Sequence, residues 1–215
     1  MDAIDFRECV VVILAAGCAE GRDLASMSAR AGARVVVVDN DAAEVNAIAR
    51  LAPDRIEALH LDVLNPAHCR VFCEAWGDEP LDLLIQCQAL RAPHRLGAAA
   101  QSIPAMTEGL AKGLARGRGR VVTLHRSAEV VENVGQRAMT HALEALPWLM
   151  QATPWAKGLR VTALRLPEGR AHHGLRMAVR GMMARDTPFA PGVVLPLSPD
   201  AIDAGRSGVK PARDE

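Results

Sequence analysis

The residues best suited to chemistry gather after the first apolar run of the sequence. Gly17 and Gly21 belong to a short turn that also holds Glu20 and Arg22. Glycines in such a turn let the backbone approach a phosphate, and the N-terminus of a following helix adds positive potential. Glu20 and Asp23, however, place two carboxylates beside that position, and Arg22 can offset one of them. The sequence therefore predicts a phosphate-binding turn of reduced strength.

Histidine and cysteine side chains occur together further along the chain. Cys69 and Cys73 are four residues apart, so both would lie on one face of a helix, with His60 and His68 nearby. Zinc sites built from cysteine usually need a second such pair, which the sequence lacks. Because free cysteine is among the most buried residue types, a buried helix face explains the pair equally well. We predict no metal site.

The elements that must position these residues alternate along the chain. Short apolar runs are separated by helix-like stretches, which is typical of a parallel sheet covered by helices on both faces. We expect one α/β domain over residues 1–198, a doubly wound parallel sheet in a three-layer α/β/α arrangement, and a flexible tail over residues 199–215. The predicted strands are residues 9–16, 34–39, 56–63, 81–87, 120–125, 159–166 and 193–197. The predicted helices are residues 24–31, 42–51, 67–76, 98–116 with a bend at Pro104, 134–156 with interruptions at Pro147 and Pro154, and 175–183.

The composition excludes several classes of protein. Half of the 215 residues are hydrophobic and 23% are charged, so a buried core is expected rather than disorder. Lys+Arg and Asp+Glu both number 25, which argues against a nucleic-acid binder. The apolar runs are too short to span a membrane, and the N-terminus is acidic rather than signal-like. Five cysteines without framework spacing indicate reduced thiols and a cytoplasmic protein.

The order and spacing of several short motifs resemble the short-chain dehydrogenase/reductase family. The resemblance extends from residue 10 to about residue 199. Residues 16–23 (AGCAEGRD) stand where the family carries its glycine-rich turn, with Gly17 and Gly21 matching. The other motifs that match, in family order, are Asp39, Asp62-Val63, residues 82–89 (DLLIQCQA), residues 119–124 (GRVVTL) and residues 189–197 (FAPGVVLPL).

This resemblance implies a Rossmann-type fold with a dinucleotide crevice. In the family, an acid at the end of the second strand binds the adenosine ribose and favours NAD over NADP, and that position is Asp39 here. NAD is therefore the cofactor expected if the crevice is occupied. The residues that the resemblance implies for cofactor binding are Gly17, Gly21, Arg22, Asp39, Asp62, Val63 and Gln88.

The residues that carry the family's activity have changed. The family uses a serine, a tyrosine, a lysine and an asparagine, but this sequence contains no tyrosine. Alignment of the relevant helix places Gln136 at the tyrosine position and Thr140 at the lysine position, and Ser127 is left as a displaced serine. A threonine hydroxyl cannot replace the phenol, because it does not share a proton near neutrality. Residues 167–192 are also too few for the family's substrate lobe, which is therefore reduced.

Three interpretations of function follow. The first is a catalytically degenerate family member that acts by binding, as a structural, regulatory or scaffold subunit. It would be a homo-oligomer or the partner of a related protein, and Trp148 and Trp155, seven residues apart, predict a helix face for such a contact or for the core. The second is an NAD-dependent oxidoreductase with His125 as acid or base, although His125 also fits a strand-end histidine bonded to neighbouring backbone. The third is a small-molecule sensor that uses the vacant crevice.

Overall fold

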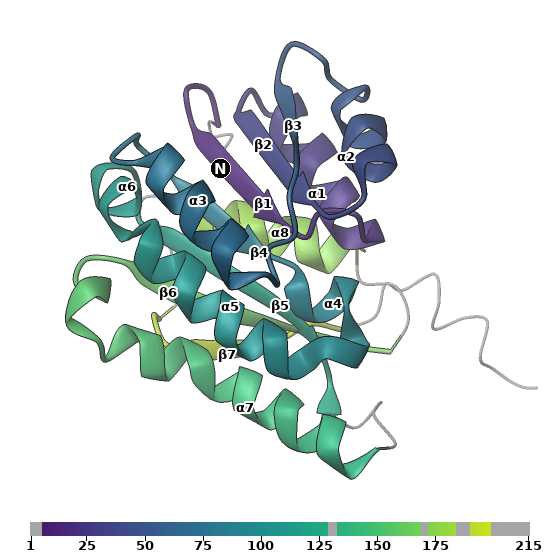
Figure 1. Ribbon diagram of the computed structural model, residues 1–215, viewed down its shortest axis with the longest axis vertical. Coiled ribbons are helices and arrows are strands. Elements are labelled where there is room, and N and C mark those ends of the chain that lie inside the picture. The colour runs from purple at the N-terminus through teal and green to yellow at the C-terminus, as the bar shows by residue number, and fades with distance from the viewer. Residues whose placement is uncertain (1–5, 129–132, 169–171, 184–189, 199–215) are drawn as a thin grey trace, which may run out of the picture.

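The computed structural model describes residues 6–128, 133–168, 172–183 and 190–198. In this part of the chain, seven parallel strands form one sheet in the order β3-β2-β1-β4-β5-β6-β7, with helices on both faces (Figure 1). The predicted doubly wound three-layer α/β/α fold is confirmed, whereas the predicted tail over 199–215 lies outside the described residues. The strands are β1 (Val10–Leu14), β2 (Arg34–Asp39), β3 (Ile56–His60), β4 (Leu83–Gln86), β5 (Arg120–Arg126), β6 (Arg160–Leu166) and β7 (Val193–Pro196).

The centre of the sheet forms the core because its strands are apolar on both faces. Residues 11–14 of β1 and 35–38 of β2 are each at most 5% exposed. The strand order reverses at β1, which pairs with β2 on one side and with β4 on the other. In an open parallel sheet, such a reversal opens a crevice beyond the carboxyl ends of the strands. The turns after β1, β2 and β4 therefore converge at one place.

The helices lie on two faces of the sheet. Helices α1, α2 and α8 cover one face, and α3, α5 and α7 cover the other (Figure 1). The connection from β6 to β7 thus passes on the opposite face from the connection between β5 and β6, which brings α8 beside α1. The helices are α1 (Ala19–Arg30), α2 (Ala42–Ala49), α3 (Pro66–Trp76), α4 (Gln88–Arg91), α5 (Leu96–Gly109), α6 (Ala111–Arg116), α7 (Val134–Gln151) and α8 (His172–Met183), with 3-10 turns at Pro93–Arg95 and Pro154–Ala156.

Two helix boundaries differ from the predicted ones for identifiable reasons. Helix α1 begins earlier, because the Cys18 sulfur accepts a hydrogen bond from the Gly21 backbone N–H at 3.4 Å and caps the helix. The helix predicted over residues 98–116 divides at Leu110, a buried residue between α5 and α6, and Pro104 remains inside α5. A further short helix, α4, precedes it.

The predicted helix over residues 134–156 is also shorter in the structure. Helix α7 ends at Gln151 and contains Pro147 without a break. Trp148 is on α7 and 66% exposed, whereas Trp155 lies in the following 3-10 turn and packs against the core. The prediction that the two tryptophans share one helix face is therefore wrong. In the described residues, no helix combines the length and hydropathy that crossing a membrane requires.

Candidate functional site

The turn after β1 is closely packed at both of its predicted glycines. A Cβ atom on Gly21 would lie 2.6 Å from the Ala16 carbonyl oxygen, so this glycine lets α1 approach the turn. A Cβ atom on Gly17 would lie 2.8 Å from both the Asp39 Oδ2 and the Arg91 Nε atoms. At the predicted phosphate-binding turn, Gly17 therefore packs against the ion pair between Asp39 and Arg91.

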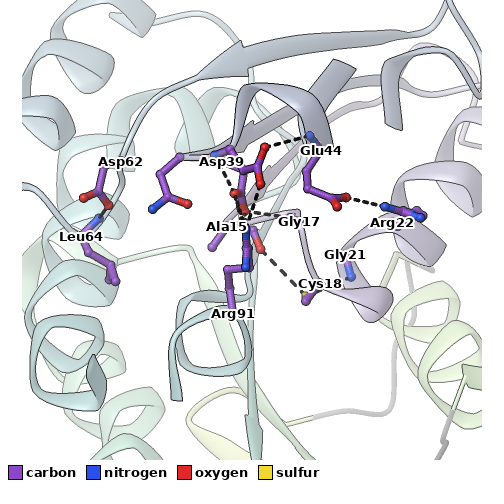
Figure 2. Close-up of polar contacts among 12 residues, drawn as sticks. Ala15, Gly17, Cys18, Gly21, Arg22, Asp39, Glu44, Asp62, Leu64 and Arg91 are labelled. Carbon is purple, nitrogen blue, oxygen red and sulfur yellow. Dashed lines mark hydrogen bonds and ion pairs between the residues drawn. The ribbon is translucent and has the colours of Figure 1, made fainter. Parts of the chain in front are cut away.

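Asp39 is the central acceptor of the crevice (Figure 2). Its side chain is 1% exposed and accepts hydrogen bonds from the backbone N–H groups of Gly17 at 2.8 Å and Asp41 at 3.0 Å. Arg91, on α4, donates from Nε to Oδ2 at 3.2 Å and from Nη2 to Oδ1 at 3.3 Å. This hydrogen bonding raises the pKa of the Arg91 guanidinium. The carboxylate expected to bind a ribose is thus already engaged by three donor groups.

The structure brings four predicted cofactor residues together around one cavity. The cavity has a volume of about 150 Å³ and is lined by residues that include Asp39, Asp62, Val63 and Gln88. Small-molecule sites usually measure about 300–1,000 Å³, so this space is small. Gln88 is buried and donates from Nε2 to the Gln86 Oε1 atom at 3.0 Å. Its own Oε1 atom has no hydrogen-bond partner within the described part of the chain.

The two carboxylates of the turn are paired with arginines from distant elements. Arg126, at the end of β5, donates to Glu20 at 2.7 Å. Arg176, on α8, donates from Nε to Asp23 at 2.7 Å. Arg22, which the sequence suggested could offset one of these charges, instead pairs with Glu44 of α2 (Figure 2). The position of α8 on the α1 face is what allows Arg176 to reach the turn.

Three of the arginine–carboxylate pairs around the crevice join residues more than 50 positions apart in the sequence, and we name them the arginine bridges. Sequence reasoning missed the arginines, because the paired residues are 52, 106 and 153 positions apart. Only the abundance of arginine over lysine, which occurs three times, hinted at a role for guanidinium groups. The bridges are Arg91–Asp39, Arg126–Glu20 and Arg176–Asp23.

His125 lies near the end of β5 and is 2% exposed. Its Nδ1–H donates to the Arg126 carbonyl oxygen at 2.9 Å, and its Nε2 has no partner among the residues described. Burial lowers the pKa of the imidazole, with Glu144 of α7 opposing and Arg165 of β6 adding to that effect. The histidine is therefore held neutral at pH 7, bonded to neighbouring backbone.

The remaining positions aligned with the family's activity are separated in the structure. Gln136 is exposed in the first turn of α7, and Thr140 is buried and donates from Oγ1 to the Gln136 carbonyl oxygen at 3.0 Å. Ser127 borders a different cavity of about 290 Å³, together with Arg165 and Glu168.

Three of the four side chains considered for metal binding contact other groups, and the fourth, His68, is exposed. The Cys69 thiol donates to the Val63 carbonyl oxygen at 3.0 Å, and the Cys73 sulfur lies 4.0 Å from the Met106 sulfur. The His60 Nε2 atom lies 3.1 Å from the Asn40 carbonyl oxygen. Over the ranges that the structure describes, no group of three or more histidine, cysteine or acidic side chains is arranged to hold a metal ion.

Comparison with solved structures finds the same fold in dehydrogenases and reductases. A 3-ketoacyl-(acyl-carrier-protein) reductase from Brucella melitensis, complexed with NADH, matches with a TM-score of 0.73 and 18% identity, over 89% of this chain and 97% of that chain. A gluconate 5-dehydrogenase from Burkholderia cenocepacia, in complex with NADP and tartrate, matches with a TM-score of 0.73 and 19% identity, over 90% and 96%. A short-chain type dehydrogenase/reductase from Mycobacterium ulcerans matches with a TM-score of 0.73 and 14% identity, over 89% of both chains. The fold that the sequence motifs implied is confirmed. No family model and no curated protein matches the sequence.

Proposed function

We propose that this chain is a degenerate short-chain dehydrogenase/reductase that has lost the reductase chemistry and acts by binding another protein subunit. The absence of tyrosine from the whole sequence removes the family's proton donor. The arginine bridges fill the place where the resemblance implies a dinucleotide. The observation that carries the proposal is the Asp39 carboxylate, which is buried and already accepts from Gly17, Asp41 and Arg91.

A nucleotide would have to compete with this internal pairing. A hydrogen bond to a charged group contributes about 2 kcal/mol, so displacing Arg91 from Asp39 weakens ribose binding by about thirtyfold. Glu20 and Asp23 would further repel a pyrophosphate once Arg126 and Arg176 were moved away. The crevice therefore favours its own arginines over NAD.

Calorimetric titration with NAD(H) and NADP(H) tests this proposal. The wild-type protein is expected to show no binding at about 1 mM dinucleotide, a limit that corresponds to about −4 kcal/mol. Arg91→Ala frees the Asp39 carboxylate and is expected to gain affinity for NADH by at least about tenfold. Arg34→Ala is the matched control, because Arg34 is an exposed arginine paired with Glu57 on the surface. Micromolar binding of NADH by the wild-type protein would overturn the proposal.

An oxidoreductase that uses His125 is the alternative function. The observation that favours it is the buried Nε2 atom, which has no hydrogen-bond partner in the described residues and is available as a base because the lowered pKa keeps it unprotonated. NAD-dependent turnover that is present in the wild-type protein and abolished in His125→Ala would support this alternative. Turnover that survives His125→Ala would exclude it.

The partner subunit is proposed to cover α7. Six residues at helical spacing form an exposed, mostly apolar band along this helix, which we name the α7 stripe. Trp148 and Leu149, at 66% and 48% exposed, are its largest members. A second copy of this chain, or a related protein, is the proposed occupant. The stripe consists of Val134, Ala138, Ala142, Ala145, Trp148 and Leu149.

A further inference from the structure

Two cysteines meet at the point where the strand order reverses. Cys18 follows β1 and caps α1, and Cys87 follows β4 and directly precedes α4. The two strands are neighbours, with Leu14 in register with Gln86, and the Cys87 backbone N–H donates to the Leu14 carbonyl oxygen at 3.0 Å. The Cys18 sulfur lies 3.9 Å from the carbonyl oxygen of Ala15, the residue that follows β1. The backbone thus brings both side chains to the same place.

The thiols of Cys18 and Cys87 are close enough to influence each other's ionisation. The interaction with Cys87 lowers the pKa of Cys18, whereas the interaction with Cys18, together with burial, raises the pKa of Cys87. Burial and the Glu20 carboxylate oppose the lowering at Cys18, and the Gly21 backbone N–H adds to it. A sulfur at a helix N-terminus that accepts from a backbone N–H has the surroundings of a reactive thiolate. Cys18 is partly exposed and Cys87 is fully buried, so a reagent would reach Cys18 first.

The other three cysteines lack these surroundings. Burial raises the pKa of Cys69, and burial likewise raises the pKa of Cys73 to about 11. Cys9 is 2% exposed. Cys69 and Cys73 nevertheless form a second pair of neighbouring thiols on α3. Cys69 and Cys73 serve as an internal comparison, because both pairs of cysteines would be oxidised if proximity of two thiols were sufficient.

We propose that Cys18 and Cys87 form a dithiol site that reacts with hydroperoxides and closes to a reversible disulfide. The Cys18 thiolate attacks the terminal oxygen of the hydroperoxide, the O–O bond breaks, and the alcohol or water leaves after taking up a proton. Cys18 is then a sulfenic acid. The Cys87 thiol attacks its sulfur, the S–O bond breaks, and water leaves with the thiol proton. In total, two thiols are oxidised to one disulfide and one hydroperoxide is reduced. A dithiol reductant restores both thiols.

Mass spectrometry after treatment with hydrogen peroxide tests the site. The protein at pH 7, with a small molar excess of peroxide, is expected to lose two hydrogen atoms from its intact mass and to regain them with dithiothreitol. Peptide mapping is expected to locate the new bond between Cys18 and Cys87. In a separate alkylation with iodoacetamide, Cys18 is expected to react at least about tenfold faster than Cys73.

Single variants separate the two steps. Cys87→Ser is expected to stop at the sulfenic acid, detected as a dimedone adduct on Cys18. Cys18→Ser is expected to remain unoxidised, and serine is a strong N-cap residue, so this variant retains the start of α1. The double variant Cys69→Ser/Cys73→Ser is the matched control and is expected to form the disulfide at the wild-type rate. Thermal unfolding of each variant establishes that it is folded.

Three outcomes would overturn the inference. They are an unchanged intact mass in the wild-type protein, a disulfide mapped to Cys69 and Cys73, and alkylation of Cys18 no faster than that of Cys73. The inference is independent of whether the crevice binds a nucleotide.

Discussion

Asp39 is a carboxylate at the end of a buried strand, and its position requires charged or polar partners. An unpaired carboxylate in such a place would cost several kcal/mol, and backbone N–H groups supply two of the necessary donors. Arg91 supplies the positive charge from α4 while its own side chain stays 32% exposed. The ion pair with Arg91 that stabilises the fold therefore also occupies the Asp39 carboxylate, which is the group that a ribose would need. At this residue, folding and nucleotide binding compete.

Gly21 and Gly97 provide a paired test of close packing. A Cβ atom on Gly21 meets Ala16 backbone atoms at 2.6 and 2.8 Å, whereas a Cβ atom on Gly97 meets nothing within 4 Å. Gly21→Ala must displace α1 and is expected to lower the free energy of unfolding by about 2 kcal/mol. Gly97→Ala, in the first turn of α5, is expected to raise it by about 0.5 kcal/mol. Urea unfolding measures both, and equal effects would refute the packing argument.

His125 predicts a dependence of stability on pH. Because burial lowers the pKa of the folded imidazole, the unfolded chain binds the proton first as the pH falls below about 6.5. The neutral imidazole of His125 therefore contributes to the stability of the fold above that pH. As the pH falls from there toward the pKa of the folded state, the free energy of unfolding decreases by at most about 1.4 kcal/mol per pH unit. His125→Gln is expected to reduce the difference in unfolding free energy between pH 7 and pH 5. His94→Gln, at an exposed histidine, is the control and should leave that difference unchanged.

At the scale of elements, capping side chains set where the helices begin. Cys18 caps α1, Asp41 caps α2, Asn65 caps α3 and Asn133 caps α7, each through a side-chain atom that accepts from a backbone N–H. Three of these are common N-cap residues. Cysteine is a weak acceptor and gave no signal in the sequence, so the beginning of α1 was predicted too late.

The cap of α2 can be measured directly. The Asp41 Oδ1 atom accepts from the N–H groups of Ala43 at 2.9 Å and Glu44 at 3.2 Å. Asp41→Ala is expected to lower the free energy of unfolding by about 1 kcal/mol, whereas Asp41→Asn keeps an acceptor and should cost only a few tenths. Asp54→Ala, at an exposed turn position, serves as control. A loss in Asp41→Asn equal to that in Asp41→Ala would assign the effect to charge rather than to capping.

At the scale of the whole molecule, the two faces of the sheet have different consequences. The face with α1 and α8 closes the crevice through Arg176 and Asp23. The face with α3, α5 and α7 carries the α7 stripe, whose six residues are exposed. An internally bridged crevice together with an exposed apolar band fits a subunit whose function depends on a protein contact.

The α7 stripe predicts self-association or association with a related protein. Trp148→Glu places a charge at the largest side chain of the proposed contact and is expected to shift the protein from dimer to monomer in sedimentation velocity. Val71→Glu is the matched control, because Val71 is also an exposed apolar residue, 58% exposed, but lies on α3. If the wild-type protein sediments as a monomer at all concentrations, self-association is excluded and only a partner of different sequence can cover the α7 stripe. If Trp148→Glu remains a dimer, the α7 stripe is not the dimer contact.

The sequence by itself determined the sheet, the placement of its strands and the absence of tyrosine. Apolar runs such as residues 35–38 predict buried strands because burial on both faces leaves a local pattern that can be read without contacts. Four of the residues predicted to bind a cofactor, Asp39, Asp62, Val63 and Gln88, line one cavity, and their binding role stays a prediction.

Only the tertiary structure decided what occupies the crevice. Arg91, Arg126 and Arg176 pair with acids 52 to 153 positions away, and no spacing in the chain records such pairings. The proximity of Cys18 to Cys87 is of the same kind, because it depends on β1 and β4 becoming neighbours. The physical reason is that hydrophobic burial is a property of each segment, whereas ion pairs and thiol contacts are properties of two segments brought together.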